Sequence, residues 1–461
     1  HFVWFAHRRI MNLRKFAPEF KNQVIMDLVS LYEIFRSHPQ VTTDSRHCPE
    51  GSLFFALKGA SFDGNAFAKS ALEQGCAYAV IDNPAYADAA DGRLILVDDV
   101  LSTLQQLANY HRRQLGTRII GITGTNGKTT TKELIAHVLM QRFRVLYTQG
   151  NLNNQIGVPL TLLRLTADDE LAVVEMGANH PGDIRELVNI VEPDYGIITN
   201  VGKAHLQGFG SFEGVIRTKG ELYDFLRTRP QSVIFLHNDN PYLARIADGL
   251  KAVRYGRPQT DGQQPAVCGE VVECSPFLHF RWQSGGEEWH HVATHLIGAY
   301  NVDNLLAAVT IGRYFGVPSD RIDAALEAYV PSNNRSQLEQ TAHNHLIIDA
   351  YNANPTSMAA ALDNFRQMTV SPKMVILGAM KELGEYSARE HRAVAEAVSA
   401  DGFDRVWLVG EEFADAVPSK ARFFRTADEV IEALKQEPLS GYYVLIKGSN
   451  SMKLASVVPY L

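Results

Sequence analysis

Short runs of apolar residues, separated by longer polar or amphipathic stretches, recur between residues 118 and 236. Continuous apolar runs of this length are typical of buried parallel strands, and helical spacing fills the intervals between them. The alternation predicts a doubly wound parallel sheet, which is an α/β fold. The four strands are expected at residues 118–123, 171–175, 195–199 and 232–236.

The pattern before this region predicts a small, separate α/β unit within residues 26–100. Two short apolar runs alternate there with helical patterns, and a polar, turn-rich loop lies between them. A further helix, at 101–115, leads into the central region. The small unit is expected to contain helices at 29–37 and 66–73, strands at 52–57 and 77–81, and the loop at 59–64.

The pattern after residue 236 changes twice. Residues 266–296 alternate apolar and polar side chains, which predicts an antiparallel patch at the edge of the central sheet. A helix at 302–315 follows, and the next four residues, Gly-Val-Pro-Ser, mark a linker and a helix start. The remainder predicts a third α/β domain. Its strands are expected at 346–349, 374–378, 406–410 and 443–448.

Length and composition agree with this division. The 461 residues suggest about three domains at roughly 150 residues each. A hydrophobic fraction of 46% and a charged fraction of 21% are those of a globular chain rather than a disordered one. Stretches long and apolar enough to span a membrane are absent from the sequence. The predicted limits are 1–25, an extension or tail; 26–100; 101–315; and 316–461.

The first residues are interpreted separately. Residues 1–24 are basic and aromatic, and their apolar stretch is too short for a signal-peptide core. We expect a misassigned upstream extension or a loose tail, with Met26 as the start of the protein. A targeting peptide is the alternative.

Charge and cysteine content exclude some classes of function. The net charge of −7 disfavours nucleic-acid binding, which requires a basic surface, but it does not exclude a phosphorylated substrate. The four cysteines form no Cys-x-x-Cys pair, so the sequence supports no structural zinc site. We expect mostly buried, reduced thiols in a cytoplasmic protein.

Residues 121–130, Gly-Ile-Thr-Gly-Thr-Asn-Gly-Lys-Thr-Thr, carry the strongest chemical signal. They join an apolar strand to a helix expected to begin near Lys128. Glycines let backbone N–H groups close around phosphate oxygens, and the helix N-terminus adds partial positive charge. Lys128 can then reach the outer phosphates, and the Thr129 hydroxyl can bind Mg²⁺. The alternative is a glycine-rich turn with a chance lysine.

The spacing of the glycines is distinctive. They fall at positions 121, 124 and 127, whereas the generic phosphate loop would begin with a glycine at position 122. This spacing resembles the phosphate loop of the Mur ligase family and its folylpolyglutamate synthase relatives. Further motifs that resemble the family follow in order at 151–160, 175–184, 199–206, 217–221, 349–355, 377–384 and 447–449.

The resemblance implies three α/β domains: a small N-terminal UDP-binding domain, a central P-loop ATPase domain and a Rossmann-like C-terminal domain. It implies an ATP-dependent amide ligase of cytoplasmic peptidoglycan precursor synthesis that works through an acyl phosphate. The motifs at 349–355 and 377–384 are similar to those of the branch that adds D-alanyl-D-alanine to UDP-N-acetylmuramoyl-tripeptide. ATP and Mg²⁺ are then the implied cofactors. A monomer without a nucleic-acid partner is expected.

Two alternatives remain at this point. A sister ligase that adds one amino acid, such as meso-diaminopimelate or lysine, shares the phosphate loop and the metal site. A nucleotide-driven switch or motor would share only the loop and would not need His205 or Lys219. The sequence does not indicate whether the third residue of the tripeptide is diaminopimelate or lysine.

The metal ligands expected are Thr129, Glu175, His205 and Lys219. Glu175 ends a strand, where a carboxylate suits Mg²⁺; a capping or surface glutamate is the alternative. His205 and Lys219 are assigned by the resemblance alone. Because a protonated lysine cannot ligate a cation, Lys219 is expected to be carbamylated, as the matching family lysine is. A helix-surface lysine near Glu221 is the alternative.

The remaining site residues also follow from the resemblance. Lys128, His205 and Lys219 are the expected catalytic residues. Asn301 is expected to face adenine, with capping of the helix at 302 as its alternative or additional role. Arg335 is expected at the phosphates and Asp349 near the ribose. The nucleotide-binding residues are completed by Gly124, Thr125, Asn126, Gly127, Lys128, Thr129 and Thr130. The expected substrate-binding residues are Ser45, Arg46, Asn153, Asn154, Tyr351, Asn352 and Asn354.

Overall fold

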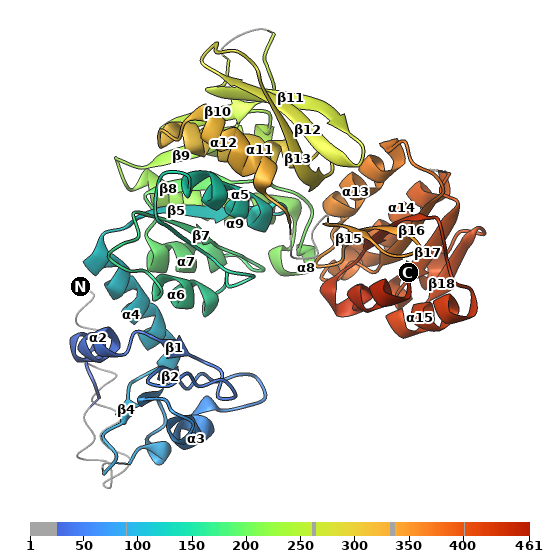
Figure 1. The fold of residues 1–461 in the computed structure, drawn as a ribbon. Helices are drawn as coiled ribbons and strands as arrows, with labels where there is room; N and C mark the ends of the chain where they lie inside the picture. Colours follow the sequence, from blue (N-terminus) through green and yellow to red (C-terminus); the bar gives the residue numbers. More distant parts are fainter. Residues whose placement is uncertain (1–24, 89, 261–263, 332–336, 401) are drawn as a thin grey trace. The chain divides into compact units, whose positions relative to one another are not determined.

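A computed structural model describes residues 25–88, 90–260, 264–331, 337–400 and 402–461 (Figure 1). The chain divides into two compact units, which are described separately. The first comprises the residues up to 116 together with 155–167, and the second comprises 117–154 and 168–461. The expectation for residues 1–24 lies outside the described part of the chain.

The first unit contains a four-stranded parallel sheet in the order β1-β2-β3-β4. Phe54, Ala56 and Ala79 pack with Leu72 and Cys76 in its core. The small α/β unit predicted from the sequence is therefore confirmed. Its elements are α2 (Leu28–Ser37), β1 (Val41–Thr42), β2 (Leu53–Phe55), η2 (Gly64–Phe67), α3 (Ala68–Glu73), β3 (Tyr78–Ile81), η3 (Pro84–Tyr86), β4 (Leu94–Leu96), α4 (Val100–Leu115) and α6 (Gly157–Leu162).

Helix α4 belongs to this first unit, although the boundary expected after residue 100 assigns it to the central domain. Its inner face is buried, and its His111 donates from Nε2 to the carbonyl of Leu165 and forms a hydrogen bond through Nδ1 with the Tyr32 hydroxyl on α2. The helix ends at Gly116, whose φ of +68° is the left-handed conformation that stops a helix. The remaining limits of the predicted domains stay a prediction.

A nine-stranded sheet forms the centre of the second unit, in the order β13-β12-β11-β10-β9-β8-β5-β7-β6. The strands from β6 to β11 pair in parallel, as the apolar runs predict. These strands are β5 (Arg118–Thr123), β6 (Val145–Tyr147), β7 (Leu171–Glu175), β8 (Tyr195–Ile198), β9 (Val233–His237), β10 (Ala252–Gly256) and β11 (Val267–Cys274). The helices between them are α5 (Lys128–Leu139), α7 (Asp183–Val191), α8 (Leu206–Phe209), α9 (Phe212–Arg227) and α10 (Pro241–Ile246).

The antiparallel patch expected at 266–296 is confirmed. Strands β12 (Phe277–Ser284) and β13 (His290–Ile297) pair antiparallel with β11 at one edge of the sheet. Burial alternates along β12, where Leu278, Phe280 and Trp282 face the core. The alternating residues therefore form a sheet with one covered face.

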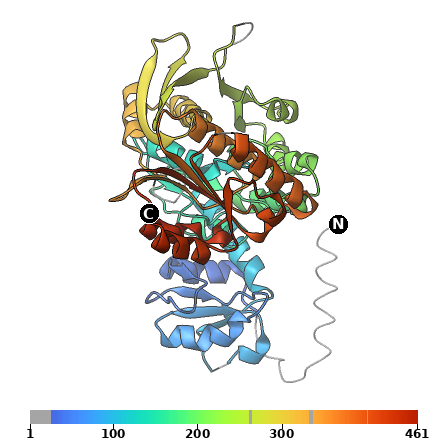
Figure 2. The same cartoon turned by 90° about the vertical axis from the view of Figure 1, so that its right-hand side faces the viewer.

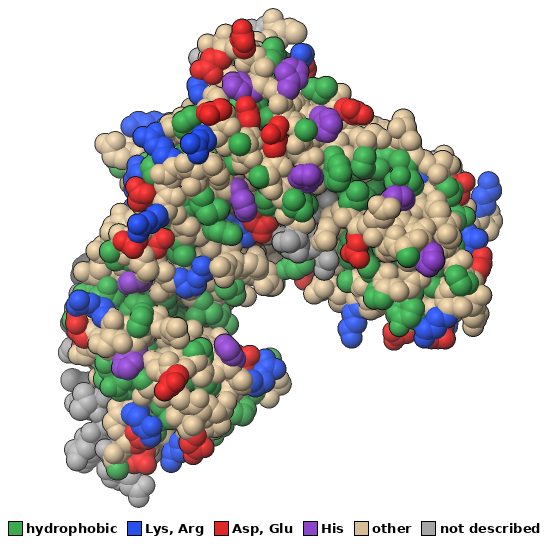
Figure 3. Space-filling model, in the orientation of Figure 1, with side chains coloured by type: hydrophobic (Ala, Val, Ile, Leu, Met, Phe, Trp, Pro, Cys, Tyr) green, Lys and Arg blue, Asp and Glu red, His purple; other side chains and the backbone are tan. Residues whose placement is uncertain are grey.

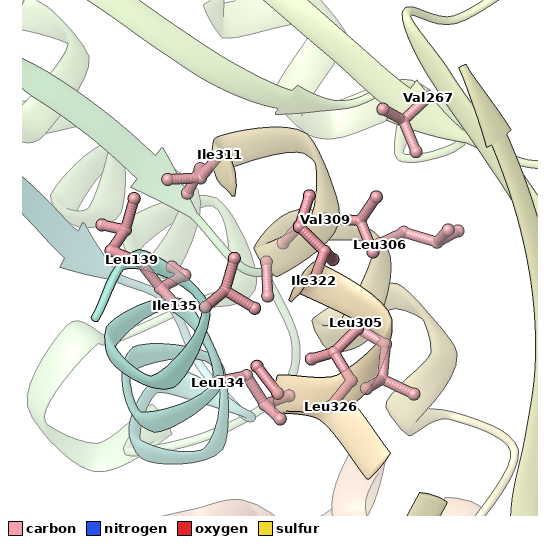
Figure 4. Close-up of a cluster of buried hydrophobic side chains, with 14 of the residues drawn as sticks. Leu134, Ile135, Leu139, Val267, Leu305, Leu306, Val309, Ile311, Ile322 and Leu326 are labelled. Carbon is pink, nitrogen blue, oxygen red and sulfur yellow. The ribbon is translucent and has the colours of Figure 1, made fainter. Parts of the chain in front are cut away.

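The helix that follows the phosphate loop is held by tight apolar packing (Figure 4). Leu134, Ile135 and Leu139 of α5 pack with side chains of α11 (Asn301–Tyr314) and α12 (Ser319–Ala328). A Cβ on Gly312 of α11 would lie 2.4 Å from a Val138 methyl, so the two helices are closely packed. Full burial of a leucine or isoleucine contributes about 1.5–3 kcal/mol, so this layer holds α5 firmly in place.

Helix α12 corrects the expected boundary at residue 316, which assigns it to the C-terminal domain. Ile322, Ala325 and Leu326 lie in the core of the central sheet. Asp323 accepts hydrogen bonds from Trp282 Nε1 on β12 and pairs with His290 on β13, each at 2.7 Å. Residues 316–318 thus connect α11 to α12 within this core, and Ser319 begins α12, as the helix start predicted there requires.

The C-terminal part has a six-stranded sheet in the order β14-β15-β19-β16-β17-β18, and β14 alone runs antiparallel to its neighbour. Helices cover both faces (Figures 1 and 2), with a separate core on each. A third α/β domain is confirmed. Its elements are β14 (Gln337–Gln340), β15 (His345–Asp349), α13 (Pro355–Gln367), β16 (Lys373–Gly378), η4 (Gly384–Tyr386), α14 (Ser387–Ala400), β17 (Arg405–Val409), η5 (Glu411–Ala416), β18 (Ala421–Phe424), α15 (Ala427–Gln436), β19 (Tyr443–Lys447), η6 (Asn450–Met452) and η7 (Leu454–Tyr460).

Three further features are the distribution of charged side chains, the length and polarity of the helices, and the state of the cysteines. On the face shown in Figure 3, lysine and arginine side chains are interspersed with aspartate and glutamate. Within the described ranges, every helix is too short or too polar to cross a bilayer. All four cysteines are free thiols, two of them buried and two partly buried.

Candidate active site

The phosphate loop lies between β5 and α5, at the carboxyl edge of the central sheet. Gly127 is the N-cap of α5 with a φ of +76°, and a Cβ there would lie 2.6 Å from Asn304 Oδ1. Gly124 has a φ of +147°, and a Cβ there would lie 2.0 Å from Thr199 Oγ1. Conformation and space both require glycine at these two positions. The strand–loop–helix context predicted for the motif is confirmed.

The loop is held by the residues that follow the adjacent strand β8. Asn200 accepts a hydrogen bond from the Asn126 amide and donates one to the Asn126 carbonyl, both at 3.0 Å. The Asn200 carbonyl also accepts from the amide of Thr125 at 3.0 Å. Because the amides of Thr125 and Asn126 are used in this way, we expect a phosphate to be bound by the N–H groups at the start of α5, beside Thr129 and Thr130.

The Lys128 side chain folds back onto the loop that precedes it. Its Nζ donates to the carbonyls of Gly124 and Thr125 at 2.9 and 3.2 Å. The ammonium group therefore stands at the mouth of the loop, next to the N-terminus of α5. A cation and a helix N-terminus at one point form a site for a polyphosphate.

Two hard oxygen ligands meet directly behind the loop. Thr129 Oγ1 donates to Glu175 Oε2 at 2.9 Å, and Asn153 Nδ2 donates to Glu175 Oε1 at 2.8 Å. Glu175 is only 1% exposed, at the end of β7, so the surface and helix-capping interpretations of it are wrong. A hydroxyl and a buried carboxylate beside a phosphate site fit Mg²⁺, and Thr129 and Glu175 would be the residues that hold it.

Lys219 lies on α9 and is 2% exposed, so the helix-surface interpretation is wrong. Its Nζ donates to the Ala178 carbonyl at 3.4 Å and stands 5.3 Å from the centre of the Phe209 ring. Burial, reinforced by the nearby Lys128 charge, lowers the pKa of Lys219 well below its ordinary value. A neutral amine is the form that carbon dioxide can carbamylate. These surroundings suit the expected modification.

His205 follows β8 and has a positive φ of 48° at the start of α8. Its Nδ1 contacts Glu382 Oε2 in the loop after β16. Burial lowers the pKa of His205, while Glu382 acts in the opposite direction. Within the described residues, groups of three or more His, Cys, Asp or Glu that could hold a metal do not occur. A second metal here would therefore depend on a carboxylated Lys219.

The remaining nucleotide residues are placed as follows. Asn301 is buried in the first turn of α11, where it donates to the Ile297 carbonyl and accepts from Asn304, both at 2.8 Å. The helix begins at Asn301 itself with Tyr300 as its N-cap, so the capping role expected for Asn301 is wrong. Asp349 ends β15 and pairs with the buried Lys447 at 2.6 Å. Arg335 lies outside the described residues.

The expected substrate residues are distributed over both units. In the first unit, Arg46 is exposed and makes two hydrogen bonds of 2.8 Å to Asp44, which hold the pKa of Asp44 at about 2. Ser45 lies between them. In the second unit Asn153 contacts Glu175, as described, and Asn154 is exposed.

Tyr351, Asn352 and Asn354 form the segment between β15 and α13. Tyr351 is half-buried and Asn352 is exposed, and the Asn352 side chain accepts from the Ala353 amide. Asn354 is buried and is the N-cap of α13. The Asn354 side chain also contacts Asn126 of the phosphate loop, and the position of each substrate residue relative to substrate stays a prediction.

Family models match nearly the whole described chain in one order. Residues 39–112 match the Mur ligase family catalytic domain, 122–312 the Mur ligase middle domain, and 334–450 the Mur ligase glutamate ligase domain. The chain belongs to the Mur ligase family. The family resemblance predicted from the motifs is thus confirmed, together with its α/β fold class.

Individual Mur ligases align with this chain over most of their length. UDP-N-acetylmuramoyl-tripeptide–D-alanyl-D-alanine ligase of Bacillus subtilis (strain 168) is 36% identical, over 91% of this chain and 92% of the relative. The ligase of the same name from Escherichia coli (strain K12) is 34% identical with the same coverage. A crystal structure of MurF from Acinetobacter baumannii is 32% identical with a TM-score of 0.81, covering 91% and 92%. MurF of Thermotoga maritima in complex with ADP is 25% identical with a TM-score of 0.80, covering 91% and 96%.

Some residues of the Mur ligase site were not predicted individually. Asn200, Glu382 and Lys447 lie inside motifs quoted in the sequence analysis, yet the motifs alone do not show which side chain makes the contact. Asn304 carried a usable signal, because it lies three residues after Asn301 and hence on the same face of a helix. Thr148, which accepts from the Glu175 amide at 2.9 Å, carried none.

Proposed function

We propose that this chain joins D-alanyl-D-alanine to UDP-N-acetylmuramoyl-tripeptide, with conversion of ATP to ADP and phosphate, in cytoplasmic peptidoglycan precursor synthesis. The observation that carries the proposal is the corner formed by Thr129, Glu175 and Asn153 directly behind the phosphate loop. The names of the aligned relatives support the choice of substrates. A monomer is proposed as well.

The proposed reaction begins at the phosphate loop. Lys128 and the N-terminus of α5 hold the outer phosphates of ATP, which reduces the repulsion between the γ-phosphate and the carboxylate of the tripeptide. Attack by that carboxylate breaks the bond to the β-phosphate oxygen and yields an acyl phosphate and ADP. The amine of the dipeptide then attacks the acyl carbon, and phosphate leaves. Phosphorylation is needed because a carboxylate has no good leaving group.

The metal site is proposed from the side chains that could form it. Thr129 and Glu175 would hold one Mg²⁺ at the nucleotide, and Lys219, once carbamylated, would hold a second together with His205. Bound Mg²⁺ would supply positive charge against the phosphoryl oxygens. Asn153 orients the Glu175 carboxylate toward Thr129.

The remaining contacts are proposed by family correspondence. Asn301 would face adenine, Arg335 the phosphates and Asp349 the ribose. Ser45 and Arg46 would bind the UDP end of the muramoyl substrate, whereas Asn154, Tyr351 and Asn352 would line the peptide part of the site.

One assay tests the proposal against both alternatives. ADP release from ATP is measured under three conditions: with UDP-N-acetylmuramoyl-tripeptide and D-alanyl-D-alanine, each also supplied alone; with a UDP-N-acetylmuramoyl-dipeptide precursor and a single amino acid; and with neither precursor nor acceptor. We expect release that depends on the tripeptide and on the dipeptide. Release supported by a single amino acid on a dipeptide precursor would indicate the sister ligase. Release without either substrate would indicate a nucleotide-driven switch.

A further inference from the structure

A pair of asparagine side chains connects the phosphate loop to the C-terminal sheet. Asn354 Nδ2 donates to Asn126 Oδ1 at 2.7 Å, and Asn126 Nδ2 lies 3.5 Å from Asn354 Oδ1. Both residues lie within the second compact unit. We infer that Asn354 is a positioning residue that fixes the phosphate loop from the first turn of α13, a role different from substrate contact. The inference rests on the proposed ATP-dependent function.

The Asn354 side chain has little capacity left for a substrate. Its Oδ1 also accepts from the Ser357 amide at 2.9 Å, which makes Asn354 the N-cap of α13. Two acceptor lone pairs and one of the two amide hydrogens are thereby in use. Asn354 is 5% exposed, so the remaining N–H has little access to solvent.

Asn126 is the residue of the phosphate loop through which Asn354 can fix the conformation of the loop. Its backbone amide and carbonyl are both fixed by Asn200, and Thr199 Oγ1 donates to the same carbonyl at 2.7 Å. The backbone of Asn126 is therefore held by the residues after β8, and its side chain makes the contact with Asn354. It lies two residues before Lys128, so its orientation bears directly on where the lysine and the helix N-terminus stand.

A second contact joins the same two segments. Thr356 Oγ1, also in the first turn of α13, accepts from the amide of Lys203 at 3.1 Å. A Cβ on Gly202 would lie 3.0 Å from that hydroxyl, so the approach is close. Residues 199–203 thus contact both the phosphate loop and α13. The segment 349–353, which immediately precedes Asn354, carries the proposed ribose and peptide contacts.

Substitutions at Asn354 can separate its two roles. Aspartate and serine are N-caps as good as asparagine, but neither offers an amide donor to Asn126. We expect Asn354→Ser and Asn354→Asp to unfold within a few degrees of the wild-type Tm. The kcat/KM for ATP should fall about tenfold or more in Asn354→Ser, because Asn126 Oδ1 loses its donor. It should fall further in Asn354→Asp, which adds negative charge near the phosphates.

Two further variants make the test specific. Ser357→Ala removes the reciprocal half of the capping box, in which Ser357 Oγ accepts from the Asn354 amide at 3.1 Å, and leaves the asparagine pair intact. It should lower Tm but keep kcat/KM for ATP. Asn126→Ala should lower kcat/KM by about as much as Asn354→Ser, and the double variant should be little worse than either single variant, because the two residues act as a pair.

Three results would overturn the inference: unchanged kcat/KM in Asn354→Ser, equal losses in Ser357→Ala, or losses that multiply in the double variant. The affinity for ADP, measured by calorimetry on the same proteins, keeps the inference separate from the proposed function. If the wild-type chain binds ADP but does not ligate, the function is wrong, and the ADP affinities of the variants still decide the role of Asn354.

Discussion

The proposed metal site has two sides, one around Thr129 and Glu175 and one around Lys219. They differ in whether the unmodified side chains already offer oxygen ligands. On the Thr129 side, the Glu175 oxygens accept from a hydroxyl and an amide at 2.9 and 2.8 Å, and the Glu175 amide is bonded to Thr148. On the Lys219 side, a buried amine has one carbonyl contact at 3.4 Å and an aromatic ring. One side already presents a carboxylate and a hydroxyl as hard oxygen ligands, whereas the other presents a nitrogen that must be modified before it can bind a cation.

This difference teaches that burial serves two purposes at one sheet edge. Around Glu175, burial comes with hydrogen bonds that hold a carboxylate in place. Around Lys219, burial disfavours the ammonium form, which lowers its pKa and makes the amine available to carbon dioxide. The first side should therefore depend on side-chain identity alone, and the second on the supply of carbon dioxide as well.

The largest effect is expected at the phosphate loop, which serves both sides. Lys128→Ala removes the cation that stands over the loop, and turnover should fall on the order of 10²- to 10³-fold. Steady-state ADP release measures it, with Lys251→Ala as a control that removes an exposed lysine immediately before β10. Turnover near the wild-type rate in Lys128→Ala would remove the basis for the ATP site.

The Lys219 side should respond differently from any ordinary side chain. Lys219→Ala should lower turnover about 10²-fold, and added formate or acetate should restore part of it by supplying the missing oxygen ligand. The comparison is activity against acid concentration in the variant and in the wild type, where no gain is expected. A variant that stays inactive at every concentration would argue that Lys219 acts as a cation instead.

The Thr129 side should show a smaller effect with a different signature. Thr129→Val removes one hydroxyl ligand while keeping the shape of the side chain, so the Mg²⁺ concentration for half-maximal activity should rise about tenfold. Thr129→Ser keeps the hydroxyl and serves as the matched control. Acetate should rescue neither variant. Rescue of Thr129→Val by acetate would make the two sides equivalent and break the comparison.

The smallest effect is expected on the free energy of unfolding. It concerns His391, which contacts the backbone of Met380 in the loop that carries Glu382. His391 is fully buried, and its Nε2 accepts from the Met380 amide at 3.0 Å, which requires the neutral ring. Burial lowers the pKa of His391. Below about pH 6.5 the unfolded chain binds a proton that the folded chain refuses, so the free energy of unfolding should decrease with falling pH.

The slope from this single group can reach at most about 1.4 kcal/mol per pH unit. Thermal unfolding between pH 7.5 and pH 5.5 measures it, with His391→Gln as the comparison, since glutamine does not titrate but offers an acceptor. An equal slope in both proteins would assign the acid sensitivity to other groups.

Most strands were predictable because their apolar runs are continuous and their ends carry glycine or polar residues. Strands β5 and β7 have the predicted limits, and the strand-to-helix context of the phosphate loop was apparent from the glycine spacing. Helix α12 was misassigned for a physical reason. A glycine–proline turn signals a break in the chain, but the packing of Ile322 and Leu326 against α5 decides which domain the helix joins.

The sequence predicted which kinds of residues form the site better than it predicted which side chains contact one another. Glu175 was assigned from its position at a strand end, and its burial followed only from the structure. The pairing of Asn126 with Asn354 joins residues 228 positions apart, and no local pattern encodes such a contact. The same holds for His205 and Glu382, which come from different sheets. Side-chain partners across sheets need the tertiary structure.

The state of the Lys219 amine is the most direct test of the difference between the two sides. Carbon-13 NMR of the protein equilibrated with ¹³C-bicarbonate and Mg²⁺ reports a carbamate carbon, with Lys219→Ala as the control. We predict one carbamate resonance in the wild type that is absent from the variant and that decreases, together with activity, when carbon dioxide is removed. A fully active wild-type protein without that resonance would contradict it.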